Sequence, residues 1–370
     1  MIAITANTSW YLYNFRQNTI KSLINSGYKV LAIAPTDDYS ERLKNLGCLF
    51  ESISIDQGGK NPLKDIYTIL NFYRLFKTHS IKCVLNFTPK NNIYGTLAAS
   101  LLNIKVINNI AGLGTLFIDE NLSSKIVRKL YKISQKKASK IFFQNEDDRD
   151  LFLNARFASK DITERLPGSG VDLERFKVSE APDDGTVRFL LIARMLYDKG
   201  VGHYVDAARV LKQKYGQKVE FRLLGFLGVN NPSAITELEM QSWVNEGIVT
   251  YLGVSDSVEK EIAKVDCMVL PSYYREGVPK SLLESGAMGK PIVTTDNVGC
   301  KETVEHGING FLCEPRSTES LITAMELIIQ MPHEKRLQMG QKSRIKMANE
   351  FNEQIIIDRY LTAIDVCLTN

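Results

Sequence analysis

The sequence is poor in residues that bind structural metals. It has only four histidines and six cysteines, and no two of the cysteines form a Cys-x-x-Cys pair. This spacing argues against a structural zinc site. Cys83 and Cys267 each open an apolar run, so we expect both to be free, buried thiols of a protein from a reducing compartment.

Long apolar runs are absent as well. No stretch of about 18 consecutive apolar residues occurs, so no membrane-spanning helix is expected. The first residues, MIAITANTSW, lack a basic segment followed by an apolar one, so no signal peptide is expected either. We therefore expect a cytoplasmic protein.

A strong excess of charge of one sign is also missing. The formal net charge is +4 over 370 residues, which does not indicate a nucleic-acid-binding chain. Hydrophobic residues make up 44% and charged residues 24%, which is typical of a globular protein. The length favours two domains, each able to bury its own core.

Short runs rich in β-branched residues alternate with longer amphipathic stretches, which predicts parallel, doubly wound α/β sheets. Helical patterns include 14–25, 63–78 and 123–136, and Asn61-Pro62 provides a helix start before the second of them. The predicted strands are 2–6, 30–34, 49–55, 83–87, 106–110, 141–144, 187–193, 219–224, 249–252, 267–270, 292–295 and 310–313.

A polar stretch with proline and glycine, 179–186, interrupts this alternation and resembles a linker. We predict two Rossmann-like domains, 1–180 and 181–352. An amphipathic final helix, 353–370, could cross back to the first domain.

Ligands of open α/β sheets bind beyond the carboxyl ends of the strands, so candidate ligand-binding residues are those in the loops that follow the strands. Arg194 and Lys199 follow the predicted strand 187–193 and precede a helix. A planar guanidinium and a point charge beside a helix N-terminus suit a diphosphate. An ordinary solvated loop with two basic residues is the alternative.

Two carboxylates follow the predicted strand 267–270. Glu276 precedes a Gly-x-Pro turn, where Gly277 lets the backbone approach a ligand, and Glu284 lies further along a helix whose first turn should hold Pro279. Such carboxylates could accept hydrogen bonds from the hydroxyls of a sugar and a ribose. The alternatives are a helix-capping acid at Glu276 and a surface helix charge at Glu284.

Together, the Arg-x4-Lys pair and the Glu-Gly-x-Pro-x4-Glu signature resemble glycosyltransferase family 4. The segments 88–95, 109–114 and 143–147 extend the resemblance into the first half, to the bacterial capsule, O-antigen and N-glycan branch that extends polyprenyl-diphosphate-linked sugars. The resemblance implies the GT-B fold, a cleft between the two domains, and retention of anomeric configuration.

The resemblance also implies roles for individual residues. Arg194 and Lys199 would hold the donor diphosphate, Glu276 would contact the donor sugar, and Glu284 would bind the ribose. The predicted catalytic residues are thus Glu276, Arg194 and Lys199, and further donor contacts fall on Gly277, Val278, Pro279, Glu284, Gly253 and Gly225. Candidate acceptor-side residues are Lys90, Asn109, Gly112 and Gly114.

One departure from the family concerns catalysis. Many members carry a histidine after the strand that corresponds to 106–110, whereas this chain has Asn108 and Asn109 there. In retaining enzymes of this type the leaving phosphate itself can accept the acceptor proton, which requires no protein base.

Two competing patterns are weaker. Gly112 and Gly114 begin a dinucleotide fingerprint whose third glycine is replaced by Phe117. Asp148 and Asp150 form an Asp-x-Asp pair, but acids at a helix start commonly interact only with the helix dipole. We expect neither a metal nor a cofactor.

The segment 121–145 contains no acid and seven bases, most of them spaced three or four residues apart. A solvated basic face, a nucleic-acid patch and a surface that faces anionic lipid are the possible interpretations, and we favour lipid. The bases predicted to face the membrane are Lys125, Arg128, Lys129, Lys132 and Lys136.

The expected function is transfer of a sugar, with N-acetylgalactosamine favoured among N-acetylhexosamines, from a UDP-sugar to a polyprenyl-diphosphate-linked glycan. The expected partners are those two substrates and the inner face of the cytoplasmic membrane, and no nucleic acid. The alternatives are a sugar-nucleotide epimerase or phosphorylase of the same fold, and a non-catalytic nucleotide-sugar-binding protein.

Overall fold

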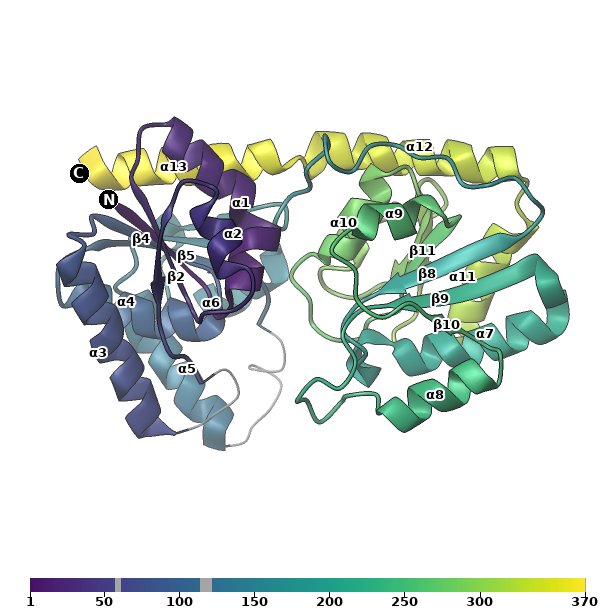
Figure 1. Cartoon of the computed structure of the whole chain (residues 1–370), viewed down its shortest axis with the longest axis horizontal. Coiled ribbons are helices and arrows are strands. Elements are labelled where there is room, and N and C mark those ends of the chain that lie inside the picture. The colour runs from purple at the N-terminus through teal and green to yellow at the C-terminus, as the bar shows by residue number, and fades with distance from the viewer. Residues whose placement is uncertain (57–60, 114–121, 370) are drawn as a thin grey trace. The chain divides into compact units, whose positions relative to one another are not determined.

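The computed structural model describes residues 1–56, 61–113 and 122–369, and it divides the chain into two compact units (Figure 1). Unit 1 comprises Met1–Ser169 and Gln354–Asn370, and unit 2 comprises Gly170–Glu353. The division follows Ser169 rather than residue 180. Phe176 is buried in the core of unit 2, and the backbone N–H of Val171 donates to the Phe351 carbonyl at 2.8 Å.

Within the described residues, unit 1 contains a seven-stranded parallel sheet in the order β3-β2-β1-β4-β5-β6-β7. The first six strands of this order form the Rossmann arrangement, in which the chain reverses its direction of growth between β1 and β4. The strands are β1 (Ile2–Thr5), β2 (Val30–Ala34), β3 (Leu49–Ser52), β4 (Cys83–Asn86), β5 (Lys105–Ile110), β6 (Lys140–Phe143) and β7 (Thr163–Arg165).

Helices cover both faces of this sheet. One face packs against α1, α2 and α13 through an apolar cluster that includes Leu12, Leu43 and Tyr360. The other packs against α3, α4, α5 and α6, with Phe72 and Tyr131 among the buried residues. The elements are α1 (Ser9–Asn25), α2 (Ser40–Lys44), α3 (Pro62–Thr78), η1 (Asn91–Gly95), α4 (Thr96–Ser100), α5 (Leu122–Gln135), α6 (Glu146–Asn154), η2 (Lys160–Ile162) and α13 (Glu353–Thr369).

The sheet of unit 2 repeats the same arrangement in the part of the chain that is described. Its order is β10-β9-β8-β11-β12-β13, all parallel, so the reversal lies between β8 and β11. The strands are β8 (Val187–Ile192), β9 (Val219–Leu224), β10 (Thr250–Tyr251), β11 (Cys267–Leu270), β12 (Ile292–Thr295) and β13 (Gly310–Cys313). The helices are η3 (Tyr197–Lys199), α7 (Val201–Tyr215), η4 (Gly216–Lys218), α8 (Glu237–Asn245), α9 (Val258–Ala263), α10 (Lys280–Ala287), η5 (Lys301–Thr303), α11 (Thr318–Gln330) and α12 (His333–Glu350).

Local sequence explains where several helices begin. The Asn61 side chain accepts a hydrogen bond from the Leu63 N–H, and Pro62 occupies the first helical position of α3, as predicted. At α8 the Thr236 and Glu239 side chains form a capping box. The cysteines also match the prediction, because Cys83 and Cys267 are free and buried.

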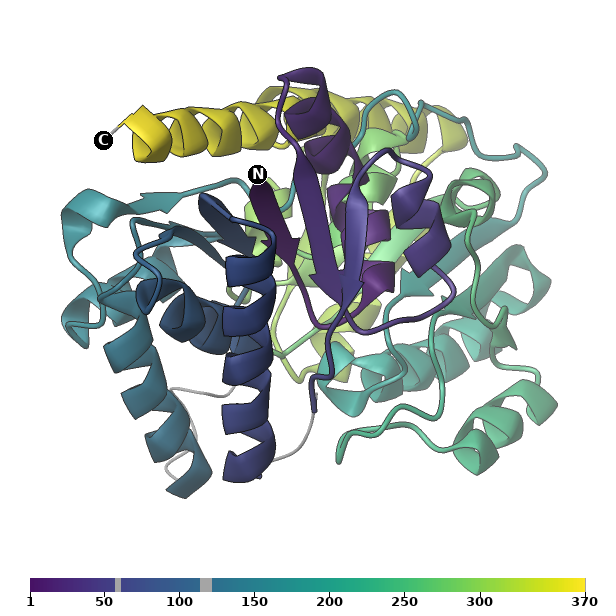
Figure 2. The same ribbon diagram turned by 60° about the vertical axis from the view of Figure 1, so that its left-hand side comes forward.

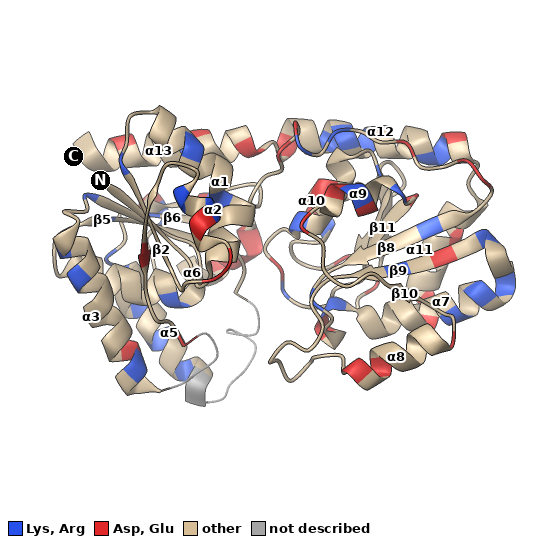
Figure 3. Cartoon of the chain, viewed as in Figure 1, with Lys and Arg blue, Asp and Glu red and all other residues tan. Residues whose placement is uncertain are grey.

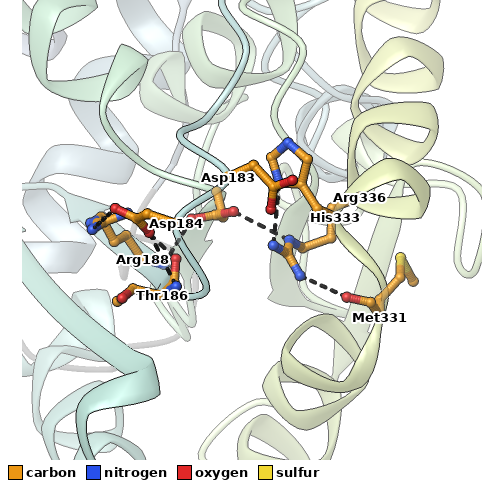
Figure 4. Close-up of polar contacts among 8 residues, drawn as sticks. Asp183, Asp184, Thr186, Arg188, Met331, His333 and Arg336 are labelled. Atoms are coloured by element: carbon orange, nitrogen blue, oxygen red, sulfur yellow. Dashed lines mark hydrogen bonds and ion pairs between the residues drawn. The ribbon is translucent and has the colours of Figure 1, made fainter.

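A cluster of ion pairs lies at the amino ends of the strands of the unit 2 sheet (Figure 4). Arg336 of α12 donates to the buried Asp266 carboxylate at 3.2 Å, and Arg188 at the start of β8 pairs with Asp184. Burial raises the pKa of Asp266. This cluster holds α12 against the sheet, so the amino ends of the strands have a structural role. The loops at the carboxyl ends of the strands are therefore the candidate place for a ligand.

Candidate active site

The reversal between β8 and β11 lies where the two motifs that the sequence predicts to bind a donor meet. β8 and β11 are adjacent parallel strands, and their carboxyl ends lead into the loops that carry Arg194 and Lys199 on one side and Glu276 on the other. A crevice at such a reversal is the general ligand site of open α/β sheets.

The loop after β8 is supported by the loop after β9. The Met195 N–H donates to the Phe226 carbonyl at 2.8 Å, and the Tyr197 N–H donates to the Ser233 carbonyl at 2.7 Å. Gly225 has a φ of +141°, and a Cβ there would lie 1.8 Å from the Ala193 carbonyl oxygen. Gly225 therefore sets how closely these two loops approach, whereas its predicted contact with the donor stays a prediction.

The loops after β8 and β11 are also in direct contact. Gly200 has a φ of +77°, and a Cβ there would lie 2.1 Å from the Pro271 carbonyl oxygen. The N–H groups of Tyr273 and Tyr274 both donate to the Asp198 carbonyl at 3.1 Å. The backbone thus fixes the two motifs relative to each other.

At the centre of this arrangement Lys199 and Glu276 form an ion pair. Their side chains are only 13% and 11% exposed, and the Ser272 hydroxyl donates to the same Glu276 oxygen at 2.9 Å. The Lys199 Nζ also lies 5.4 Å from the centre of the Tyr274 ring. The structure therefore brings these two predicted residues together, and Ser272 and Tyr274 support the pair although the sequence did not single them out.

Arg194 differs from Lys199 in its surroundings. Its side chain is exposed and forms no hydrogen bond or ion pair with any residue that the structure describes. A guanidinium at a strand end that no described residue neutralises is available for an anion.

Glu284 lies in α10 and is buried, with a side chain that makes no hydrogen bond or ion pair within the described parts of the chain. Burial raises its pKa to about 7, although the charges of Lys280 and Arg175 act in the opposite direction. The alternative interpretation of Glu284 as a surface helix charge is therefore wrong, and a buried carboxylate without a partner among the described residues suits a ligand hydroxyl.

The turn between the two acids differs from the prediction by one residue. Pro279 is the N-cap of α10 and not part of its first turn, because its ψ of 122° is extended. Val278 is buried, and Asn297, after β12, donates to the Tyr274 carbonyl at 2.9 Å. Gly253 belongs to the same set of loops, since its carbonyl accepts the Gly225 N–H at 2.8 Å.

In unit 1 the structure distinguishes the two asparagines at the position of the family histidine. The Asn108 side chain hydrogen-bonds to Asn86, Thr96 and Gln135, so its role is structural. The Asn109 side chain is 1% exposed, yet neither its Oδ1 nor its Nδ2 has a partner within the described structure. Such an amide, at the carboxyl end of β5, is the stronger candidate for a ligand contact.

The other acceptor-side candidates have varied surroundings. Lys90 pairs with Asp65 at 2.8 Å, so its charge is partly neutralised. Gly112 has a φ of +136°, and Gly114 lies outside the described residues. The Asp148 carboxylate accepts hydrogen bonds from the Leu113 N–H and the Asn145 side chain, which gives it a structural role at the start of α6.

The basic residues lie along α5 (Figure 3). Lys125, Lys129, Lys132 and Lys136 are exposed, and Arg128 is half-buried. No helix in the described residues is both long and apolar enough to cross a bilayer.

Comparison with known proteins matches both units. Residues 172–346 match the family Glycosyl transferases group 1, and residues 1–145 match Glycosyl transferase 4-like. The chain is a glycosyltransferase of the GT-B fold. The prediction of fold and of enzyme class is thereby confirmed, whereas the cleft between the domains stays a prediction.

The chain is similar to two glycosyltransferases whose names state the sugar that they transfer. The chain is 28% identical over 97% of its length, and 96% of the other protein, to the N,N'-diacetylbacillosaminyl-diphospho-undecaprenol alpha-1,3-N-acetylgalactosaminyltransferase of Campylobacter jejuni. It is 23% identical to the UDP-Gal:alpha-D-GlcNAc-diphosphoundecaprenol alpha-1,3-galactosyltransferase of Escherichia coli, over 78% of this chain and 76% of that one. Among solved structures, Anabaena Alr3699/HepE in complex with UDP-glucose aligns with a TM-score of 0.79 at 17% identity, over 99% of both chains.

Proposed function

We propose that this glycosyltransferase moves an N-acetylhexosamine, with N-acetylgalactosamine favoured, from a UDP-sugar to a polyprenyl-diphosphate-linked glycan during surface polysaccharide or glycan synthesis. The proposal is supported by similarity over nearly the whole chain to the Campylobacter jejuni enzyme, whose name describes such a transfer. The reaction would retain the anomeric configuration of the donor, as the family resemblance implies.

The observation that carries the proposal is the Lys199–Glu276 pair at the strand reversal of unit 2. Arg194, which has no partner in the described parts of the chain, lies on the same loop as Lys199. A donor diphosphate would bring two negative charges to these cations. It would draw Lys199 toward phosphate and leave a Glu276 oxygen able to accept a hydrogen bond from a sugar hydroxyl.

The same cations would stabilise the charge that develops on the leaving diphosphate, which is why we propose that the reaction needs no metal. The bond between C1 of the donor sugar and the phosphate oxygen breaks as the acceptor oxygen attacks C1 on the same face. The acceptor proton passes to the departing phosphate. Asn109, in place of the family histidine, is consistent with a reaction that uses no protein base.

The proposed acceptor is attached to a membrane lipid, so the enzyme would have to act at a membrane surface. We propose that it acts as a peripheral protein at the inner face of the cytoplasmic membrane, with the exposed bases of α5 toward anionic lipid.

Transfer of radiolabelled sugar from a panel of UDP- and GDP-sugars into an organic-extractable lipid fraction, with chelator present, tests the proposal. We expect label in the lipid phase from UDP-N-acetylgalactosamine. Label that depends on added divalent metal would contradict the metal-free reaction. Conversion of the donor without a new glycosidic bond would indicate an epimerase, consumption of inorganic phosphate would indicate a phosphorylase, and donor binding without turnover would indicate a binding protein.

The pKa of Glu284 predicts a pH dependence of donor binding. Because burial raises this pKa to about 7 and ribose hydroxyls bind best to the ionised carboxylate, affinity should rise with pH and level off above 7. Below 7 the affinity should fall by up to about tenfold per pH unit. Titration calorimetry with a UDP-sugar, whose phosphates do not titrate in this range, measures the profile.

Glu284→Gln is the control for this profile, since its amide does not ionise. It should bind the donor more weakly at high pH and show a flat profile. In the absence of donor, the wild type should lose stability as the pH rises from about 4.5 to about 7, because the carboxylate ionises in the unfolded state before it ionises in the folded one, and the Gln variant should not. Identical binding profiles for the two proteins would show that Glu284 does not contact the ribose.

A further inference from the structure

Helix α3 of unit 1 is apolar on two faces. Thr68, Phe72 and Phe76 are buried against the sheet, while a second row points outward with exposed fractions from 49% to 76%. This second row consists of Leu63, Ile66, Tyr67 and Leu70. Their spacing of three, four and seven residues places all of them on one face, and four large apolar residues on one exposed helix face mark an interaction surface.

Helix α5 also carries exposed apolar residues. Ile126 and Ile133 are about half exposed, at 53% and 48%, and they alternate with the exposed lysines of the same helix. Both α3 and α5 pack on the same face of the sheet and both contact η1. Figure 1 and Figure 2 show the two helices beside each other on that face of unit 1.

The apolar row of α3 begins at the end of unit 1 where the strands have their carboxyl ends. In a parallel α/β sheet each helix runs from the carboxyl end of one strand back to the amino end of the next, so a helix begins at the carboxyl end. Leu63 near the start of α3 and Lys125 near the start of α5 thus lie at the same end of unit 1 as Asn109 and Gly112. A lipid carrier bound to this surface would present its glycan at that end.

We propose that the exposed faces of α3 and α5 form a membrane-docking surface, in which the α3 row inserts among the lipids of an anionic bilayer while the α5 lysines bind its headgroups. This inference rests on the proposed function and extends it, because it assigns the insertion to α3, which carries few of the bases.

Charge and apolarity together identify the occupant. From residue 122 to 145 the chain contains bases and no acid, and the one acid early in α3, Asp65, is paired with Lys90. An apolar row bordered by lysines that pair with no acid among the described residues is the pattern of a helix that lies in a membrane interface. Each base near an anionic surface strengthens binding by about fivefold.

Flotation of the purified full chain with lipid vesicles tests the surface directly. We compare phosphatidylcholine vesicles with vesicles that also contain phosphatidylglycerol. The wild type should float with the anionic vesicles, and Leu63→Gln/Ile66→Gln/Tyr67→Gln/Leu70→Gln should weaken this binding more than tenfold. The charge variant Lys125→Glu/Lys129→Glu/Lys132→Glu/Lys136→Glu should abolish the preference for anionic vesicles.

Unit 2 offers a matched control for the apolar variant. Val210, Leu238, Leu327 and Ile345 are comparably exposed, and their joint change to Gln should leave flotation unchanged. Flotation of the α3 variant equal to that of the wild type would overturn the proposal. Loss of self-association in place of loss of lipid binding would also overturn it, because the row would then be a contact between copies of the chain.

A single substitution keeps the test valid if the fourfold variant does not fold. Leu63→Trp should show tryptophan emission that is quenched by vesicles of brominated lipid, whereas Leu238→Trp should not be quenched more than the wild type. No additional quenching at position 63 would refute insertion.

Transfer assays separate a failure of this surface from a failure of the proposed function. The α3 variant should keep its turnover with a water-soluble, short-chain polyprenyl-diphosphate acceptor and lose at least tenfold with a long-chain acceptor in vesicles. If the wild type transfers no sugar to any acceptor but its flotation still depends on the α3 row, the proposed function fails and the docking surface stands. Equal transfer by variant and wild type from vesicles would refute a role for the surface in catalysis at the membrane.

Discussion

Glu276→Ala should lower the turnover number for sugar transfer by about a thousandfold while leaving the fold intact. The carboxylate lies at the strand reversal of unit 2, paired with Lys199 and accepting the Ser272 hydroxyl. Its removal would eliminate a contact to the donor sugar and leave Lys199 without its partner. Radiolabel transfer at saturating donor measures the effect, and a thermal melt monitors the fold.

Glu237→Ala is the matched control, since Glu237 is an exposed acid of the same unit in the first turn of α8. It should retain wild-type turnover. Glu276→Gln should lie between the wild type and Ala, because its amide oxygen can still accept a hydrogen bond but cannot pair with Lys199 as a charge. Turnover of Glu276→Ala within a few-fold of the wild type would show that another group contacts the sugar.

Arg194→Met should reduce kcat/KM for the donor by about a hundredfold. The Arg194 guanidinium is exposed and has no partner among the described residues, so it is available to bind the proposed donor diphosphate in the ground state and as this group leaves. Both the donor KM and kcat should therefore change. Steady-state kinetics with varied donor, at fixed acceptor, measure the two separately.

Arg188→Met gives a control on the same strand. Arg188 lies at the amino end of β8 and pairs with Asp184, so its loss should affect stability and leave the kinetic constants unchanged (Figure 4). Arg194→Lys should be impaired less than Arg194→Met, because it keeps the charge but loses the two-pronged geometry. Equal kinetics for Arg194→Met and the wild type would remove Arg194 from the site.

Most of the fold follows from the sequence because buried parallel strands are short apolar runs. The sequence does not predict β7, because this strand is not an apolar run. Its sequence is Thr-Glu-Arg, and only Thr163 is buried, as an edge strand permits. The end of unit 1 was placed too late along the chain because the contacts that tie Val171 to Phe351 and Glu353 join residues about 180 positions apart.

The site was harder to predict than the fold. The residue types and their place after strands were visible, but the sequence does not reveal strand order, so the pairing of Lys199 with Glu276, 77 residues apart, appears only in the structure. The outward row of α3 was missed because a helical pattern does not show which of two apolar faces is buried. The side-chain amide of Asn109 has no partner among the described residues, and it can be distinguished from that of Asn108 only when the partners of both are known.

Two glycines fix the conformation of the loop after β8, and they restrict how the proposed donor site can change through mutation. At Gly200 and Gly225 any side chain would begin within about 2 Å of a backbone carbonyl oxygen, so these positions tolerate no substitution without moving the loops that carry Arg194 and Lys199. Selection for a new donor sugar, in nature or in a mutant library, should therefore leave both glycines untouched. It should accumulate its changes instead among the exposed side chains around them.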